Sequence, residues 1–162
     1  MQLLHQSFEY ACYEDSSELG ASDAALLKEA RRATKTAYAP YSGFQVGAAL
    51  RLEGDILITG SNQENAAFPA GLCAEMVALA AASSRYPGVP VLDLAISYDD
   101  RKGKSDSPVS PCGICRQSLV EQEERFGRPV RLILGGLSGR VYVVESASSL
   151  MPLAFSSADL AR

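Results

Sequence analysis

One stretch organises this chain: Asn62–Glu75, which reads NQENAAFPAGLCAE. It contains Cys73, followed two positions later by Glu75, and a downstream motif, PCGIC, adds Cys112 and Cys115. Because these last two cysteines are three residues apart at a predicted helix start, both sulfurs can reach one point. Zinc prefers tetrahedral sulfur or nitrogen ligands at a Zn–S distance of about 2.3 Å. We therefore predict that the three cysteines form one zinc site.

Such a site would have only three protein ligands, which is the arrangement of a catalytic zinc rather than a structural one. Cys73 also falls at a predicted helix start, where free N–H groups and the helix dipole favour a thiolate. Zinc with an open position lowers the pKa of water toward neutrality, and the reaction then needs a group that moves protons. Glu75 lies two residues from a ligand and is predicted to be that group.

Two other interpretations of the cysteines stay open at this point. Cys112 and Cys115 alone could form a redox pair at a strand-to-helix junction. The three cysteines could instead form a structural zinc site whose fourth ligand is His5, the only histidine of the chain. Both interpretations leave Glu75 and the polar residues before Cys73 without a role.

The bulk composition is that of an ordinary globular protein. The 162 residues are 47% apolar and 21% charged, which is enough for one domain with a hydrophobic core. A net charge of -4 without any Lys/Arg run argues against a nucleic-acid partner. No apolar run approaches the roughly 20 residues of a membrane helix, and the N-terminus does not resemble a signal peptide. We therefore expect a cytoplasmic protein that has no membrane partner and whose four cysteines are not disulfides.

The order of predicted elements indicates an α/β domain. A short strand is expected within residues 4–13, with Cys12 buried, and a helix is expected to be capped by Ser22 or Asp23. Further strands are predicted at 44–52, 56–61, 91–97, 130–134 and 141–144, and further helices at 72–85 and 113–126. The segment 99–110 is predicted to be a solvated loop. This order fits one mixed sheet with helices on both faces.

Several motifs in the same order resemble those of the small tetrameric cytidine deaminases. The matching segments are YAPYS at 38–42, FQVGAAL at 44–50, NQENA at 62–66, CAE at 73–75, PCGICRQ at 111–117 and LMPLAF at 150–155. The resemblance covers roughly residues 22–160 and leaves 1–21 as an N-terminal extension. It implies a single cytidine deaminase-like domain over residues 1–162. The implied fold is a three-layer α-β-α sandwich with a mixed five-stranded sheet.

The resemblance also implies an activity and the residues that perform it. Zn2+ bound by Cys73, Cys112 and Cys115, with Glu75 as the catalytic proton carrier, would convert cytidine and 2'-deoxycytidine to uridine and 2'-deoxyuridine. Ammonia would be released, in a reaction of pyrimidine salvage. The implied substrate-binding residues are Phe44, Asn62, Glu64, Ala66, Phe68, Tyr41 and Phe155. Phe155, and Tyr41 near a subunit boundary, would serve a neighbouring subunit's site in a homotetramer.

One position departs from the family pattern. The family usually has an arginine directly after the catalytic glutamate, and this chain has Met76, which cannot donate hydrogen bonds to the thiolates. We expect Arg116 or the helix dipoles to compensate in part. Blasticidin deaminases also carry an apolar residue there, so a modified cytosine nucleoside is an alternative substrate, although they lack the Asn-x-Glu-Asn motif of residues 62–65. The alternative from another class is a zinc or redox binding module without catalysis.

Overall fold

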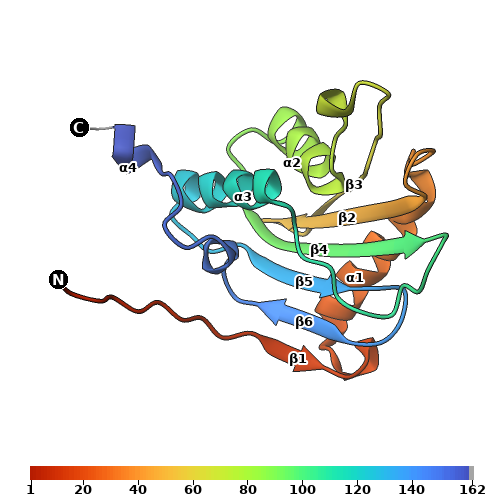
Figure 1. The fold of residues 1–162 in the computed structure, drawn as a ribbon, viewed down its shortest axis with the longest axis horizontal. Coiled ribbons are helices and arrows are strands. Elements are labelled where there is room, and N and C mark those ends of the chain that lie inside the picture. Colours follow the sequence, from red (N-terminus) through yellow and green to blue (C-terminus); the bar gives the residue numbers. More distant parts are fainter. Residues whose placement is uncertain (161–162) are drawn as a thin grey trace.

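A twisted mixed sheet lies between helices in the computed structural model, which describes residues 1–160 (Figure 1). The last two residues of the predicted domain lie outside the described part. The strands are β1 Ala11–Tyr13, β2 Phe44–Leu52, β3 Ile56–Ser61, β4 Val91–Asp100, β5 Arg131–Gly135 and β6 Val141–Val144. The helices are α1 Ala21–Ala33, α2 Ala74–Arg85, α3 Gly113–Phe126 and α4 Ser157–Leu160, with 3-10 turns at Ser16–Glu18, Thr34–Thr36, Phe68–Ala70 and Ala147–Leu150. The predicted α-β-α layering is confirmed.

Over residues 1–160 the sheet has six strands in the order β1-β6-β5-β4-β2-β3, one more than the resemblance implied. The pair β4–β5 is parallel and is connected through α3, whereas the other neighbours are antiparallel. The additional strand comes from the N-terminal extension, because Ala11–Tyr13 pairs with Val141–Val143 at the sheet edge. The five-stranded prediction is therefore wrong only at this edge, where the resemblance had no counterpart.

Cys12 is exposed, so the prediction that it is buried is wrong. Tyr13 packs against the core on the α1 side, and because successive strand residues point to opposite faces, Cys12 points away from α1. The preceding tail, which carries His5, is exposed and runs away from the sheet (Figure 1). His5 is thus separate from the cysteine cluster, and no histidine within residues 1–160 belongs to that cluster.

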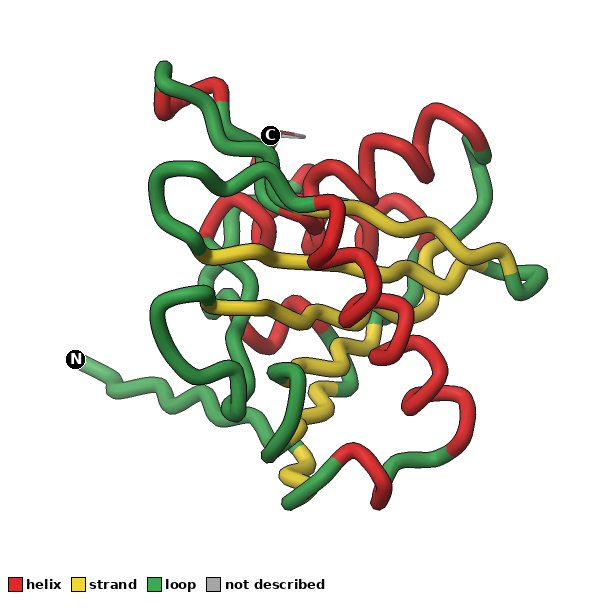
Figure 2. Tube along the Cα trace, turned by 90° about the vertical axis from the view of Figure 1, so that its right-hand side faces the viewer, coloured by secondary structure: helices red, strands yellow, loops and turns green. Residues whose placement is uncertain are grey.

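Helix α1 covers one face of the sheet, and α2 and α3 cover the other; Figure 2 shows these layers after a quarter turn. Alternation along β2 divides its residues between the two cores: Ala48 and Leu50 pack with α2, whereas Ala49 packs with α1. Gly60 of β3 lets α2 approach closely, since a Cβ there would lie 2.5 Å from the carbonyl oxygen of Ala74. This close contact fixes the N-terminal end of α2, which carries the first predicted zinc ligand.

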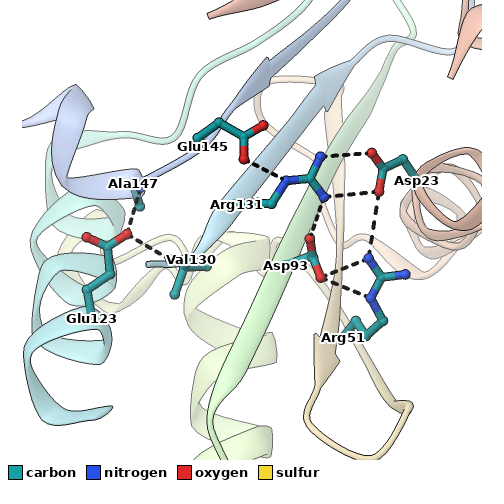
Figure 3. Close-up of polar contacts among 8 residues, drawn as sticks. All are labelled: Asp23, Arg51, Asp93, Glu123, Val130, Arg131, Glu145 and Ala147. Carbon is teal, nitrogen blue, oxygen red and sulfur yellow. Dashed lines mark hydrogen bonds and ion pairs between the residues drawn. The ribbon is translucent and has the colours of Figure 1, made fainter. Parts of the chain in front are cut away.

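Helix α1 begins at Ala21 and has Gly20 as its N-cap residue, so the predicted caps at positions 22 and 23 are wrong. Asp23 in the first turn instead forms ion pairs with Arg51 and Arg131 (Figure 3). Both arginines also pair with Asp93 of β4. These four residues form an ion cluster at the ends of β2 and β4 that lie away from the cysteines, and it ties α1 to the sheet.

Glu123 of α3 makes a second set of polar connections in the same region of the molecule. Its carboxylate accepts hydrogen bonds from the backbone N–H groups of Val130 and Ala147, both at 2.8 Å (Figure 3). The helix is thereby joined to the start of β5 and to the turn after β6.

None of the helices within residues 1–160 has both the length and the apolar character that a membrane span requires.

Candidate active site

The three predicted zinc ligands lie at the N-terminal ends of two helices. Cys73 immediately precedes α2, Cys112 immediately precedes α3, and Cys115 lies buried in the first turn of α3. The Sγ atoms of Cys73 and Cys112 are 3.6 Å apart, and those of Cys112 and Cys115 are 3.4 Å apart. These distances exceed the S–S bond of about 2.05 Å, so all three are free thiols gathered at one point.

This sulfur cluster has the dimensions of a zinc site. Tetrahedral zinc with Zn–S bonds of about 2.3 Å places neighbouring sulfurs about 3.8 Å apart, close to the observed spacing. Hydrogen bonds with the thiols of Cys115 and then Cys112 lower the pKa of Cys73 to about 6, so Cys73 is a thiolate at neutral pH. The hydrogen bond with Cys73, together with burial, raises the pKa of Cys115, which is therefore the proton donor of the pair. The donor set fits zinc, which binds cysteine as thiolate and would displace the thiol protons.

A cavity of about 310 Å³ opens beside two of the sulfurs. Residues from β2, from β4 and from the segment before α3 form its walls, and the strip Asn62–Glu75 forms the remainder. The predicted site residues that line it are Phe44, Asn62, Glu64, Phe68, Cys73, Glu75 and Cys112. The structure therefore brings most of the predicted residues to one cavity.

Glu75 is the buried carboxylate of this cavity. It lies in the first turn of α2 and is 4% exposed, although it lines the cavity with Cys73. Burial raises the pKa of Glu75 above its ordinary value, because removal from water destabilises the charged carboxylate more than the neutral acid. A raised pKa brings a carboxyl group closer to the range of a general acid–base catalyst, which must both accept and donate a proton.

Asn62 and Glu64 are both held in place by the backbone around β2. The Asn62 side chain accepts a hydrogen bond from Val46 N at 2.8 Å and donates one to Phe44 O at 3.0 Å. Glu64 Oε2 accepts hydrogen bonds from the backbone N–H groups of Tyr41 and Ser42. Hydrogen bonding with Ser42 and then with Tyr41 lowers the pKa of Glu64, which keeps it ionised. Each side chain retains hydrogen-bonding capacity, and both line the cavity.

Three predicted substrate-binding residues lie outside this cavity. Tyr41 is half exposed and contacts Phe68 edge-on in a neighbouring hollow, with ring centroids 6.1 Å apart. Ala66 is exposed in the loop before Phe68. Phe155 is 57% exposed on the C-terminal segment, where its carbonyl oxygen accepts a hydrogen bond from Gln117. Within a single chain, these three residues do not complete the cavity.

Outside the strip Asn62–Glu75, four lining residues are absent from the predicted site: Val46, Ile96, Val109 and Ser110. The first two could have been found, because Val46 shares a strand face with Phe44 and Ile96 lies on the neighbouring strand. Val109 and Ser110 belong to the segment predicted as a solvated loop. No periodicity marks them, and only the folded path of the chain brings them to the cavity.

The expected compensation by Arg116 does not take the form of a hydrogen bond to the sulfurs in the described structure. Arg116 Nε donates to Pro111 O at 2.8 Å, and Nη1 donates to Leu150 O at 2.9 Å. The guanidinium therefore ties the residue before Cys112 to the C-terminal segment. Met76 lies in a groove between α2 and α3 that also includes Gln117.

Comparison with known proteins decides the family. Residues 21–126 match the family model described as the cytidine and deoxycytidylate deaminase zinc-binding region. The chain is also 38% identical over 135 residues to the cytidine deaminase of Halalkalibacterium halodurans, which covers 83% of this chain and 95% of that protein. This chain belongs to the cytidine deaminase family.

Solved structures of the cytidine deaminase family have the same fold. The crystal structure of cytidine deaminase from Burkholderia pseudomallei matches with a TM-score of 0.68 and 37% identity, over 81% of this chain and 97% of that chain. The enzyme from Mycobacterium tuberculosis matches with a TM-score of 0.62 and 29% identity, over 82% and 95%. The family-model match begins at residue 21, so β1 belongs to a segment that precedes it.

Proposed function

We propose that this chain catalyses the zinc-dependent hydrolysis of cytidine and 2'-deoxycytidine to uridine and 2'-deoxyuridine, with release of ammonia. The observation that carries the proposal is the position of Glu75. A buried carboxyl with a raised pKa shares one cavity with Cys73 and Cys112 and with the hydrogen-bonding side chains of Asn62 and Glu64. Neither a redox pair nor a structural zinc site needs these features.

In this proposal Cys73, Cys112 and Cys115 hold the zinc ion. Zinc supplies the nucleophile for C4 of the cytosine ring by lowering the pKa of a water molecule. Glu75 would take a proton from this water molecule and deliver it to N3 of the ring, and it would then carry the hydroxyl proton of the tetrahedral intermediate to the departing amine. Because the carboxyl of Glu75 is buried, its neutral form is more favoured than in an exposed carboxyl group, and the raised pKa suits a group that accepts and donates a proton in one turnover.

The remaining cavity residues are proposed to recognise the nucleoside. Asn62 and Glu64 bind the 3'-hydroxyl of the sugar, using the hydrogen-bonding capacity left after their backbone contacts. A substrate without that hydroxyl would leave these groups unpaired, which is a strong basis for discrimination. Phe44 packs on the pyrimidine, Phe68 closes the pocket, and the backbone of Ala66 contacts the base.

The proposed active form is a homotetramer with shared sites. Tyr41 and Phe155 are exposed aromatic residues outside the cavity of their own chain, and in this proposal they serve the site of a neighbouring subunit. The whole chain is proposed to act as one domain to which residues 1–21 add an N-terminal extension. We place its activity in the cytoplasm, where the three cysteine ligands stay reduced.

Met76 supports a second candidate substrate, a modified cytosine nucleoside such as a blasticidin-like compound. The pair Asn62 and Glu64 favours an ordinary nucleoside, because the proposed partner of these side chains is a sugar hydroxyl. Turnover of cytidine, deoxycytidine and blasticidin under the same conditions separates the two candidates.

The test follows the fall in ultraviolet absorbance as cytidine or deoxycytidine is deaminated, together with the zinc content of each protein. We expect an active parent with one zinc per chain. Glu75→Gln should retain zinc while its kcat falls by about a hundredfold or more, as for loss of a general acid–base group. Glu29→Gln, which removes the carboxylate of a surface ion pair with Arg32 on α1, is the matched control and should keep full activity.

The outcomes separate the proposal from the non-catalytic alternative. A zinc-loaded parent that deaminates neither nucleoside would contradict the proposed reaction and favour a binding module. An active Glu75→Gln protein would remove Glu75 from the proposed role while leaving the reaction in place.

A further inference from the structure

Tyr98 of β4 is a buried aromatic residue directly behind the proposed base pocket. It is 6% exposed, and its ring stacks on that of Phe44 with centroids 4.8 Å apart and an interplanar angle of 20°. Phe44 lines the cavity, whereas Tyr98 supports it from the adjacent strand. The stack therefore fixes the orientation of the ring that is proposed to pack on the pyrimidine.

The Tyr98 hydroxyl contacts the segment that leads to a different wall of the same cavity. It donates to Lys104 O at 3.5 Å and lies 3.3 Å from Ser107 Oγ. Because a tyrosine hydroxyl has one proton, it donates to the carbonyl and accepts from the serine. Both partners belong to the 101–110 segment, which connects β4 to the residues before α3.

The 101–110 segment is anchored, although its composition predicts a solvated loop. Ser105 Oγ accepts from Asp100 N at 2.9 Å, and Ser105 O accepts from Ser138 N at 3.2 Å. Gly136 permits this close approach, since a Cβ there would lie 2.2 Å from Ser105 O. Val109 and Ser110 then enter the cavity wall. The hydroxyl of Tyr98 thus holds the segment just before two residues that line the cavity.

We propose that Tyr98 is a positioning residue for substrate binding, which couples the Phe44 wall of the base pocket to the Val109–Ser110 wall through its ring and its hydroxyl. This inference rests on the proposed function and extends it to a residue that does not itself contact the substrate. A loosened 101–110 segment would have to become ordered each time a nucleoside binds. Loss of the Tyr98 anchor should therefore weaken substrate affinity rather than slow the chemical step.

The test compares Tyr98→Phe with Ser107→Ala and with the double variant. Tyr98→Phe keeps the stack and removes only the hydroxyl. We expect each single change to raise KM for cytidine about fivefold, as for loss of one ordinary hydrogen bond, with kcat held within about twofold. Because the Ser107 hydroxyl acts through Tyr98 in this proposal, the double variant should raise KM no further than Tyr98→Phe alone, whereas independent effects would multiply to about twenty-fivefold.

The matched control is Tyr86→Phe, which removes a hydroxyl from a partly buried tyrosine on the same core but away from the cavity. Its KM should equal that of the parent. A Tyr98→Phe protein that loses thermal stability while keeping the parental KM would overturn the proposal, because a purely structural role predicts that result.

A second readout does not depend on activity. Trypsin can cleave after Arg101, Lys102 and Lys104, all within the 101–110 segment. Tyr98→Phe and Ser107→Ala should both accelerate cleavage at these positions about fivefold relative to the parent and to Tyr86→Phe. Parental cleavage rates in both variants would overturn the anchoring role. An inactive parent would contradict the proposed function, and proteolysis would then still decide whether Tyr98 anchors the segment.

Discussion

Asp93 and Arg131 are register partners on the parallel strands β4 and β5, and their side chains form an ion pair with a distance of 2.9 Å between Oδ1 and Nη1. The Asp93 side chain is only 6% exposed, and its other oxygen pairs with Arg51 at 2.8 Å. Asp23 of α1 contacts both arginines from the helix side (Figure 3). One buried carboxylate therefore holds two guanidinium groups between three neighbouring strands.

Replacing this carboxylate should destabilise the fold without affecting the reaction. We expect Asp93→Asn to lower the free energy of unfolding by about 3 kcal/mol, because it leaves two partly buried arginines short of a partner. Glu53→Gln, which breaks an exposed pair with Arg128, should cost less than about 1 kcal/mol. Urea denaturation measures both changes. Equal losses in the two variants would show that burial of Asp93 adds nothing.

Two glycines make a matched pair of close contacts on opposite faces of the sheet. A Cβ at Gly60 would lie 2.5 Å from Ala74 O of α2, and a Cβ at Gly47 would lie 2.1 Å from Ala30 O of α1. Both of these oxygen atoms belong to helix backbone, so they cannot move away as the end of a flexible side chain could. Each alanine substitution should therefore displace a helix and cost about 1–3 kcal/mol of unfolding free energy.

Only one of these displaced helices carries site residues. Gly60→Ala moves the end of α2 that holds Cys73 and Glu75, so we expect kcat/KM for cytidine to fall about a hundredfold, together with weaker zinc binding. Gly47→Ala moves α1 and should leave both quantities near the parental values. Steady-state kinetics and zinc competition with a chromophoric chelator measure the difference. Similar activity losses in the two variants would contradict the assignment of α2 as the site helix.

Much of the fold could be predicted because its signals are local. The hairpin β2–β3 is bounded as predicted, since Gly54 and Asp55 both adopt the left-handed backbone of a tight turn between two apolar runs. The cysteine cluster was equally accessible, because Cys112 and Cys115 are fixed relative to each other by one helical turn. Cys73 was assigned to the same site because it also lies at a predicted helix start, and the fold brings its sulfur within 3.6 Å of that of Cys112.

The features that were missed depend on contacts between distant parts of the chain. Asp23 was predicted as a helix cap, but its carboxylate instead pairs with Arg131, which lies more than 100 residues further along the chain. The segment 99–110 has no periodicity, and its order comes from Tyr98 and from glycines in the β5–β6 turn. Helix α1 ends at Ala33, where the Thr34 hydroxyl donates to Arg31 O and the chain tightens into a 3-10 turn.

The neutral side chain of Met76 directly follows Glu75, at a position where a cation would offset the negative charge of three thiolates. Arg116 does not supply that cation through hydrogen bonds to the sulfurs, since its Nε and Nη1 groups donate to Pro111 O and Leu150 O. Met76→Arg should make bound zinc a stronger Lewis acid. We therefore expect the acid limb of the pH profile of kcat to move to lower pH.

Two controls separate charge from other effects of the Met76 substitution. Met76→Gln adds a hydrogen-bond donor without charge and should leave the profile near that of the parent. Ala80→Arg adds the same cation on an exposed position one turn further along α2, where the solvent screens it, and should shift the profile much less. The measurement is kcat for cytidine between about pH 5 and 9, with zinc content determined for each variant. A Met76→Arg enzyme that binds one zinc and keeps the parental profile would show that the helix dipoles at Cys73 and Cys112 already balance the thiolate charge.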